Sequence, residues 1–152
     1  MRQSTHKIGM AELTYFLLGA LLLLFLAMVA KGQQPLFREY RGVRLGMTAA
    51  ETRAKLGEPA FKSDEQDFYV ISTNETAQIA YKEQKIVTIS IDYASGVGAP
   101  DYRSVVGEGL LLTRPDGSLF RMVMNDPERF WVTYNKSASA VPLVTITIGA
   151  YK

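Results

Sequence analysis

The chain has 152 residues, a net charge of +2, a single histidine and no cysteine. The lack of cysteine excludes disulfides, thiol catalysis and thiolate metal sites, and the one histidine, His6, precedes the apolar segment, so nucleophile–histidine pairs are excluded from the remainder. Basic and acidic residues balance beyond residue 35, because three of the 17 Lys and Arg residues and one of the 15 Asp and Glu residues lie before it, which argues against a nucleic-acid-binding surface.

An uncharged apolar segment occupies residues 13–30, with the sequence LTYFLLGALLLLFLAMVA. A helix of this length spans roughly 27 Å at about 1.5 Å per residue, close to the ~30 Å hydrocarbon core of a bilayer. The segment therefore predicts a transmembrane anchor at 13–31 after an N-terminal tail at 1–12, with the lipid bilayer as partner of residues 13–30. A cleaved signal peptide is the alternative, since Ala30 and Gly32 are small, although Lys31 lies between them.

The basic residues that flank the apolar segment give mixed information on topology. The N-terminal flank carries Arg2 and Lys7, and the C-terminal flank carries Lys31, Arg38, Arg41 and Arg44. This count alone does not place the long tail outside the cell. A short basic head, an apolar run and a long tail are typical of an export signal, however. We therefore predict a single-pass protein of the bacterial cytoplasmic membrane whose C-terminal domain is extracytoplasmic (periplasmic).

A linker at 32–41 and a first repeat at 42–93 follow the anchor. Thr48 and Glu51 have the spacing of a capping box, in which each side chain binds a free backbone amide at the start of a helix. Gly57 and Pro59 are typical of a helix end. These signals predict a short helix over 49–56.

Three runs with strand character follow this helix, at 67–73, 77–82 and 85–93. Glu83 and Gln84 form a tight turn between the last two. In the third run, alternation predicts that Val87, Ile89 and Ile91 point to one side, with Thr88 and Ser90 on the other.

A similar pattern recurs at 94–152. TRAKLGE (52–58) returns as YRSVVGE (102–108), IAYK (79–82) as VTYNK (132–136), and IVTISI (86–91) as LVTITI (143–148), with 117–124 in the place of the first strand. We therefore predict an α+β fold in which one N-terminal transmembrane helix precedes two αβββ repeats, which form an antiparallel sheet backed by short helices. The alternative is that unrelated β-meanders share such patterns.

The segment GVRLGMTAAETRAKLGEP (42–59) resembles the helix motif of the BamE (SmpA/OmlA) family of bacterial envelope proteins. Two tandem copies of such a unit are similar to the architecture of the β-lactamase inhibitory protein, in which helices back a sheet whose open face grips a partner. The chain lacks the lipid-modified cysteine of BamE and carries an anchor segment instead. The resemblance implies a fold, an envelope location and protein binding.

A cluster of carboxylates precedes the first strand. Asp64, Glu65 and Asp67 could hold a hard cation such as calcium, whereas a solvated loop is the favoured interpretation because calcium loops usually supply more oxygen ligands. We expect no catalytic, cofactor-binding or metal-binding residues, and no cofactor.

Alternation across the strands predicts a binding face on the side of the sheet away from the helices. The residues on this predicted face are Trp131, Thr133, Lys82, Thr88, Thr145 and Thr147. An exposed tryptophan on a threonine-rich surface is a plausible hot spot for a protein partner. The alternative is that the loop 136–142 covers Trp131.

A neutral domain without reactive groups, on a single apolar anchor, indicates a protein that is not an enzyme. We expect an accessory or scaffolding subunit that binds a larger integral-membrane protein complex, for example an energy-transducing one such as a respiratory or photosynthetic assembly. The alternatives are a BamE-like envelope assembly factor and an inhibitor-type binder of a soluble enzyme.

Overall fold

The structure, a computed structural model, describes residues 36–151. The predicted N-terminal tail, the predicted transmembrane helix and residues 32–35 of the predicted linker lie outside this part of the chain. Among the helices within residues 36–151, none combines the length and the apolar character needed to span a bilayer.

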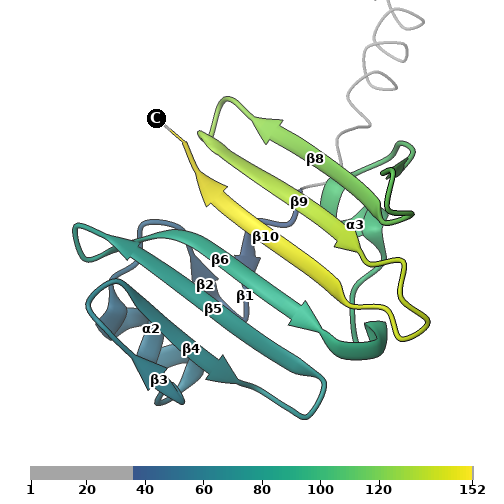
Figure 1. The fold of residues 1–152 in the computed structure, drawn as a ribbon. Coiled ribbons are helices and arrows are strands. Elements are labelled where there is room, and N and C mark those ends of the chain that lie inside the picture. The colour runs from purple at the N-terminus through teal and green to yellow at the C-terminus, as the bar shows by residue number, and fades with distance from the viewer. Residues whose placement is uncertain (1–35, 152) are drawn as a thin grey trace, which may run out of the picture. The chain divides into compact units, whose positions relative to one another are not determined.

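The described chain consists mainly of strands (Figure 1). The first half contains β1 (Glu39–Tyr40), β2 (Val43–Arg44), α2 (Ala49–Leu56), β3 (Phe61–Lys62), β4 (Gln66–Val70), β5 (Glu75–Lys82) and β6 (Lys85–Tyr93). The second half contains the 3-10 turn η1 (Ala94–Gly96), α3 (Tyr102–Val106), β7 (Leu112–Thr113), β8 (Leu119–Asn125), β9 (Phe130–Lys136) and β10 (Val144–Ala150). β1 and β2 form a separate hairpin, and the other eight strands form one antiparallel sheet in the order β3-β4-β5-β6-β10-β9-β8-β7.

The predicted fold class, α+β with two αβββ repeats, is wrong, because the described chain is mostly β and each half contributes four strands to the sheet. The extra strands β3 and β7 are two residues long, too short for alternation to reveal them. The hairpin β1–β2 covers the end of the predicted linker and the start of the predicted first repeat. Its turn residues Arg41 and Gly42 both have positive φ, which suits the tight turn between two antiparallel strands.

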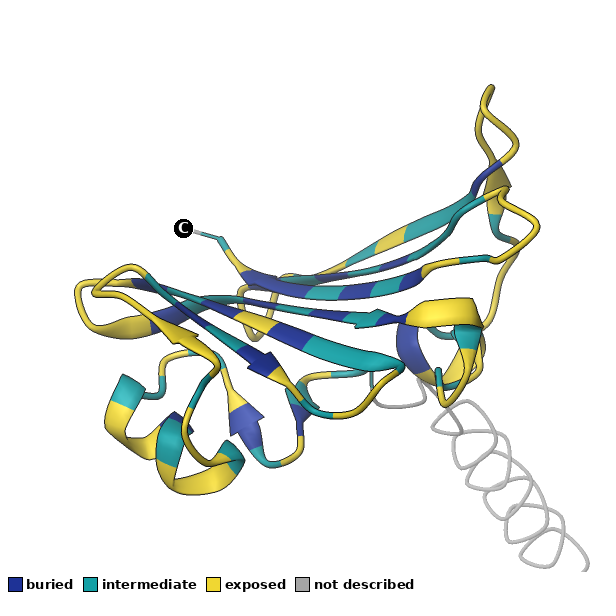
Figure 2. Ribbon diagram, turned by 60° about the horizontal axis from the view of Figure 1, so that its bottom comes forward, coloured by how far each residue is buried: buried dark blue, intermediate teal, exposed yellow. Residues whose placement is uncertain are grey.

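The hydrophobic core lies between the sheet and the elements on one side of it. Figure 2 shows α2, the hairpin β1–β2 and α3 on the same side of the sheet. The fully buried residues of the long strands include Ile79, Ile89, Ile91, Ile146 and Ile148, and they pack with Val43, Val105 and Val106 from the covering elements. The β-branched side chains therefore determine which face of the sheet is covered.

The helix predicted over 49–56 is confirmed, together with its capping box. The Thr48 hydroxyl accepts a hydrogen bond from the backbone N–H of Glu51, and a Glu51 carboxylate oxygen accepts one from the N–H of Thr48 at 2.8 Å. The helix ends at Gly57, whose N–H donates to the carbonyl of Arg53. α3 ends in the same way, since the N–H of Gly107 donates to the carbonyl of Arg103.

A β-bulge changes the predicted facing of one residue in β6. Ala80 pairs with Thr88 and Tyr81 pairs with Ile86, so Val87 has no register partner on β5. Ile86 is consequently buried and Val87 is half-buried, whereas the sequence predicted that Val87 faces the core. The tight turn at Glu83 and Gln84 is confirmed by positive φ values of 52° and 61°.

The two halves match in architecture but differ in register. Ile89 and Ile146, the predicted counterparts, are both fully buried in central strands. Ile79 pairs with Ile89 in the first half, but its predicted counterpart Val132 pairs with Ile148. When β5 is aligned with β9 by the predicted repeat, the pairing of β10 with β9 is therefore shifted by two residues relative to the pairing of β6 with β5.

Candidate binding face

Alternation with the buried core residues places the predicted binding-face residues on the side of the sheet opposite the helices. Figure 1 shows the sheet from this side. Among the described residues, no helix lies on this side, and we call it the open face. Trp131 and Thr88 flank Gly149 in register, and Thr133 and Ser90 flank Thr147. Each alternates along its strand with buried core residues. The sheet thus brings strands from both halves of the chain onto one surface.

Polar side chains in the middle of the open face bind one another across strands. The hydroxyls of Ser90 and Thr147 are 3.2 Å apart, and the Thr145 hydroxyl donates to Asp92 at 2.6 Å. Further along, the Gln78 amide donates to Gln66 at 2.8 Å. These cross-strand hydrogen bonds satisfy the polar side chains even when no partner protein is bound. The threonines therefore form a surface that is compatible with water.

Lys82 lies at the end of this arrangement. It is exposed and pairs with Lys85 beside the turn that joins β5 to β6. It lies on the same face of β5 as Gln78 and Ala80. It is two residues beyond Ala80, which lies in line with Trp131 across the sheet through Thr88 and Gly149. Lys82 is therefore a peripheral member of the predicted set.

Trp131 is half-buried, and its indole packs over its register partner Gly149. A Cβ added to Gly149 would overlap the Cζ2 and Cε2 atoms of the indole. The alternative in which the loop 136–142 covers Trp131 does not fit the register. That loop joins the strands beyond the pair Lys136–Val144, five residues from Trp131, which corresponds to about 17 Å along a strand.

The open face also carries an apolar patch that the sequence analysis missed. Register places Met124 opposite Trp131 and Phe120 opposite Leu112. Met122 lies between Phe120 and Met124 on the same side of β8. We call Leu112, Phe120, Met122, Met124 and Trp131 the apolar patch. The alternation of SLFRMVMN could have revealed it, had the strand over 117–124 been assigned an inner and an outer face.

The members of the apolar patch are accessible to a large degree. Leu112 is 68% exposed, Met122 45% and Met124 49%. Phe120 is half-buried, and the guanidinium of Arg114 stacks 3.9 Å from the centre of its ring. Methionine adapts to irregular partner surfaces, and tryptophan and arginine are the residues most often found at binding hot spots.

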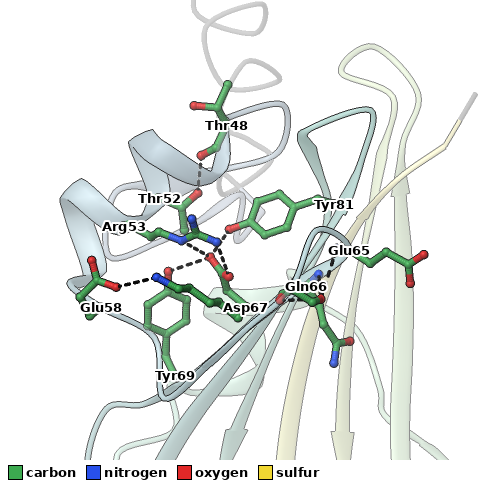
Figure 3. Close-up of polar contacts among 11 residues, drawn as sticks. Thr48, Thr52, Arg53, Glu58, Glu65, Gln66, Asp67, Tyr69 and Tyr81 are labelled. Carbon is green, nitrogen blue, oxygen red and sulfur yellow. Dashed lines mark hydrogen bonds and ion pairs between the residues drawn. The ribbon is translucent and has the colours of Figure 1, made fainter.

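One member of the acidic cluster at the start of β4 has a structural role. Asp67 is fully buried, and Arg53 of α2 donates to both of its carboxylate oxygens, at 2.7 and 3.0 Å. The hydroxyls of Tyr81 and Tyr69 also donate to this carboxylate, at 2.9 and 3.3 Å (Figure 3). The carboxylate of Asp67 is thus engaged in joining α2 to the sheet.

Asp64 and Glu65 are exposed neighbours of this network. Within residues 36–151, no group of three or more carboxylates and histidines has a geometry that could hold a metal ion. The Asp67 network also affects the tyrosines. Burial, followed by smaller contributions that include the hydrogen bond to Asp67, raises the pKa of Tyr81 to about 12. Burial and the nearby Asp67 charge likewise raise the pKa of Tyr69.

Comparison of the chain with family models, with curated proteins and with solved structures gave no significant match.

Proposed function

We propose that this protein is a non-catalytic accessory or scaffolding subunit that binds a larger integral-membrane protein complex through its open face. Residues 13–30 anchor it in the bacterial cytoplasmic membrane, and the sheet domain is extracytoplasmic. An energy-transducing complex is the partner class that we favour. The observation that carries the proposal is the apolar patch, which includes Trp131, on a sheet face that no described helix covers.

The proposal is supported by the free-energy cost of leaving this patch exposed to water. Contiguous apolar surface on a sheet is unfavourable when solvated, and a cluster of methionines and aromatics of this kind typically marks a protein interface. The hydrogen-bonded threonines beside it provide a rim that tolerates water. This arrangement of an apolar centre and a polar margin is typical of a protein-binding surface and offers no convergent reactive groups.

The buried polar network supports a scaffolding role in preference to a catalytic one. The carboxylate of Asp67 lies on the helix side of the sheet and is held by Arg53 and two tyrosine hydroxyls. It therefore stabilises the domain from the side opposite the patch. The helix side of the sheet therefore stabilises the fold, and the open face is left for binding a partner.

The experiment is copurification of the full-length chain from native membranes in mild detergent. We expect the wild type to migrate with a large assembly on a native gel or gradient, and the double variant Met122→Gln with Met124→Gln to dissociate from it. Val70→Gln is the matched control, because Val70 is 60% exposed on β4, a strand of the other half of the sheet. Thermal unfolding of each variant checks that the domain remains folded.

Retention of the double variant in the assembly, or equal loss with the Val70 control, would contradict the proposal. Recovery of the partner from the soluble fraction would instead favour an inhibitor-type binder of a soluble enzyme, which the same open face could serve. A BamE-like envelope assembly factor remains the other candidate, supported by the capping box at Thr48 and the glycine end of α2. Loss of outer-membrane protein assembly on deletion would identify that role.

A further inference from the structure

The outer edge of β8 is only partly covered by another strand. β7 pairs with Leu119 and Phe120 at the start of β8, and within residues 36–151 no other strand lies on that side. The rest of β8, residues 121–125, is therefore a free sheet edge (Figure 1). This stretch contains no proline and no lysine, the residues that commonly protect sheet edges from pairing with another chain.

The alternation of the backbone determines which groups point outward from this edge. The N–H of Arg114 donates to the carbonyl of Ser118 at 2.8 Å, so the backbone carbonyl of Ser118 faces the outer side of β8. Successive residues of a paired strand direct their N–H and C=O groups to opposite neighbours. Met122 and Met124 therefore direct theirs to the same outer side as Ser118.

Pairing inside the sheet gives the same assignment. The N–H of Ser137 donates to the carbonyl of Leu143 at 2.9 Å, toward β10, so alternation directs the backbone groups of Val132 to β8. Val132 pairs with Val123, which leaves the two methionines directed outward. Within residues 36–151, their four outward N–H and C=O groups make no hydrogen bond.

The chain before β7 turns away from this edge. If the ladder between β7 and β8 continued, Leu110 would lie opposite Met122, but Leu110 is 85% exposed. Gly109 has a φ of 136°, which other residues rarely adopt. The Arg121 guanidinium donates to the carbonyl of Glu108 at 2.7 Å and fills the space in which a side chain at Gly109 would lie. These contacts end β7 early and leave the edge open.

We propose that two copies of this chain pair through their β8 strands, antiparallel and centred on Val123. In this register, Met122 lies opposite Met124 of the second copy, and Met124 lies opposite Met122 of that copy. Each of these two pairs exchanges two backbone hydrogen bonds. All the outward N–H and C=O groups of both methionines in both copies are thereby satisfied, in a closed two-fold contact.

The neighbouring two-fold registers satisfy fewer groups. A centre one residue earlier would require Phe120, whose backbone groups face Leu112 of β7. A centre one residue later would require Asp126, whose carbonyl already accepts from the N–H of Arg129 at 3.3 Å. The edge is thus complementary to a second copy of itself in one register.

The side chains are compatible with the same pairing. Met122 and Met124 of the two copies would pack together on the open face, and Arg121 would lie opposite Asn125 of the second copy, so no like charges meet. The dimer would join two apolar patches into one surface, and its formation does not depend on the partner complex. One strand pair is small beside the roughly 1,200 Å² of a stable interface, so we expect weak association.

The experiment is disulfide cross-linking of the purified full-length chain in mild detergent, which single-cysteine variants permit because the chain has no cysteine. Val123 of the two copies would form a non-hydrogen-bonded pair with Cα atoms about 4.5 Å apart, within reach of a disulfide. Met122 is displaced by two residues from Met122 of the second copy, beyond the roughly 7 Å limit. Val70→Cys, 60% exposed on β4, is the control for random collision.

We expect Val123→Cys to form covalent dimers roughly tenfold or more faster than Val70→Cys under mild oxidation, because pairing raises the effective concentration of the two thiols. It should also react faster than Met122→Cys. Exposure alone predicts the opposite order, since Met122 is 45% exposed and Val123 is half-buried. Trp131 emission checks that each variant remains folded.

Met122→Pro in the Val123→Cys background tests the backbone pairing. Proline removes an outward N–H that the ladder with β9 does not use, so cross-linking should fall to the level of Val70→Cys. Equal rates at positions 123, 122 and 70, fastest reaction at 122, or fast cross-linking in a folded Met122→Pro variant would overturn the inference. The purified chain contains no partner complex, so such a failure leaves the copurification result of the proposed function unaffected.

Discussion

The indole of Trp131 occupies the space over Gly149, its register partner on the neighbouring strand. A larger residue at position 149 would overlap the ring, so the glycine makes room for the tryptophan. The tryptophan in turn covers backbone that the glycine leaves bare. Trp131 is therefore partly a component of the sheet surface and partly available to a partner.

Gly149→Ala should displace the indole from β10 and lower the melting temperature. Because Trp131 is the only tryptophan of the chain, its fluorescence reports this movement directly. We expect a red shift of emission as the ring becomes more exposed to water. Thr147→Ala, on the same face of β10, is the control and should leave the emission unchanged. An identical spectrum for Gly149→Ala would show that the indole does not depend on this contact.

Trp131→Ala should lower the free energy of unfolding by about 1–2 kcal/mol, because only part of the ring is buried. This is less than the about 3–5 kcal/mol typical of a fully buried tryptophan. Chemical denaturation of the purified protein measures the change. A loss in the range of a core tryptophan would remove Trp131 from the apolar patch and assign it to the core.

Arg53→Met should destabilise the domain by about 3 kcal/mol or more, because it leaves the Asp67 carboxylate buried without its ion-pair partner. Arg103, the predicted counterpart in the second half, provides a matched control. Its guanidinium is exposed and its carboxylate partners lie at 3.5 and 3.9 Å, so Arg103→Met should cost less than about 1 kcal/mol. Equal effects of the two substitutions in urea denaturation would contradict the role assigned to Asp67.

Replacing either central isoleucine with alanine, Ile89→Ala or Ile146→Ala, should cost about 2–5 kcal/mol, since both side chains are fully buried. Val87→Ala is the informative comparison. Val87 sits in the bulge and is half-buried, so its truncation should cost distinctly less. A Val87 variant as unstable as the isoleucine variants would mean that the bulge does not turn this side chain out of the core.

Stability should fall as pH rises through the range from about 10 to 12. Burial raises the pKa of Tyr81 and of Tyr93 from 10 to about 12. A folded-state pKa above the unfolded value means that the folded protein holds these protons more tightly. The stabilisation is thus complete below pH 10 and is lost as pH rises through the folded-state values.

The measurement is the denaturation midpoint as a function of pH, with tyrosine ionisation followed by absorbance. Within residues 36–151, the hydroxyl of Tyr93 makes no hydrogen bond to another side chain or to the backbone. Tyr93→Phe therefore removes one ionising group without breaking a hydrogen bond. It should make stability fall less steeply at alkaline pH and change stability little at neutral pH. Unchanged steepness in this variant would contradict the role of Tyr93.

Local signals in the sequence determined the short helix and the long strands. The capping box at Thr48 and the terminal glycine at 57 act over one helical turn, and the alternation in β6 and β10 reflects one buried face. Such features depend on neighbours a few residues away, so they are visible in the sequence. The side of the sheet on which Trp131 and the threonines lie follows from the same alternation.

Only the tertiary structure decided the number of strands, the registers and the apolar patch. β3 and β7 exist because β4 and β8 provide partners for two residues each, and the bulge at Val87 arises from pairing with β5. The sequence predicted Asp67 to be a carboxylate of a solvated loop. The fold instead buries it among Arg53 and two tyrosines. These features depend on contacts between residues distant in sequence, whose geometry is set by how the strands pair and which elements cover the sheet.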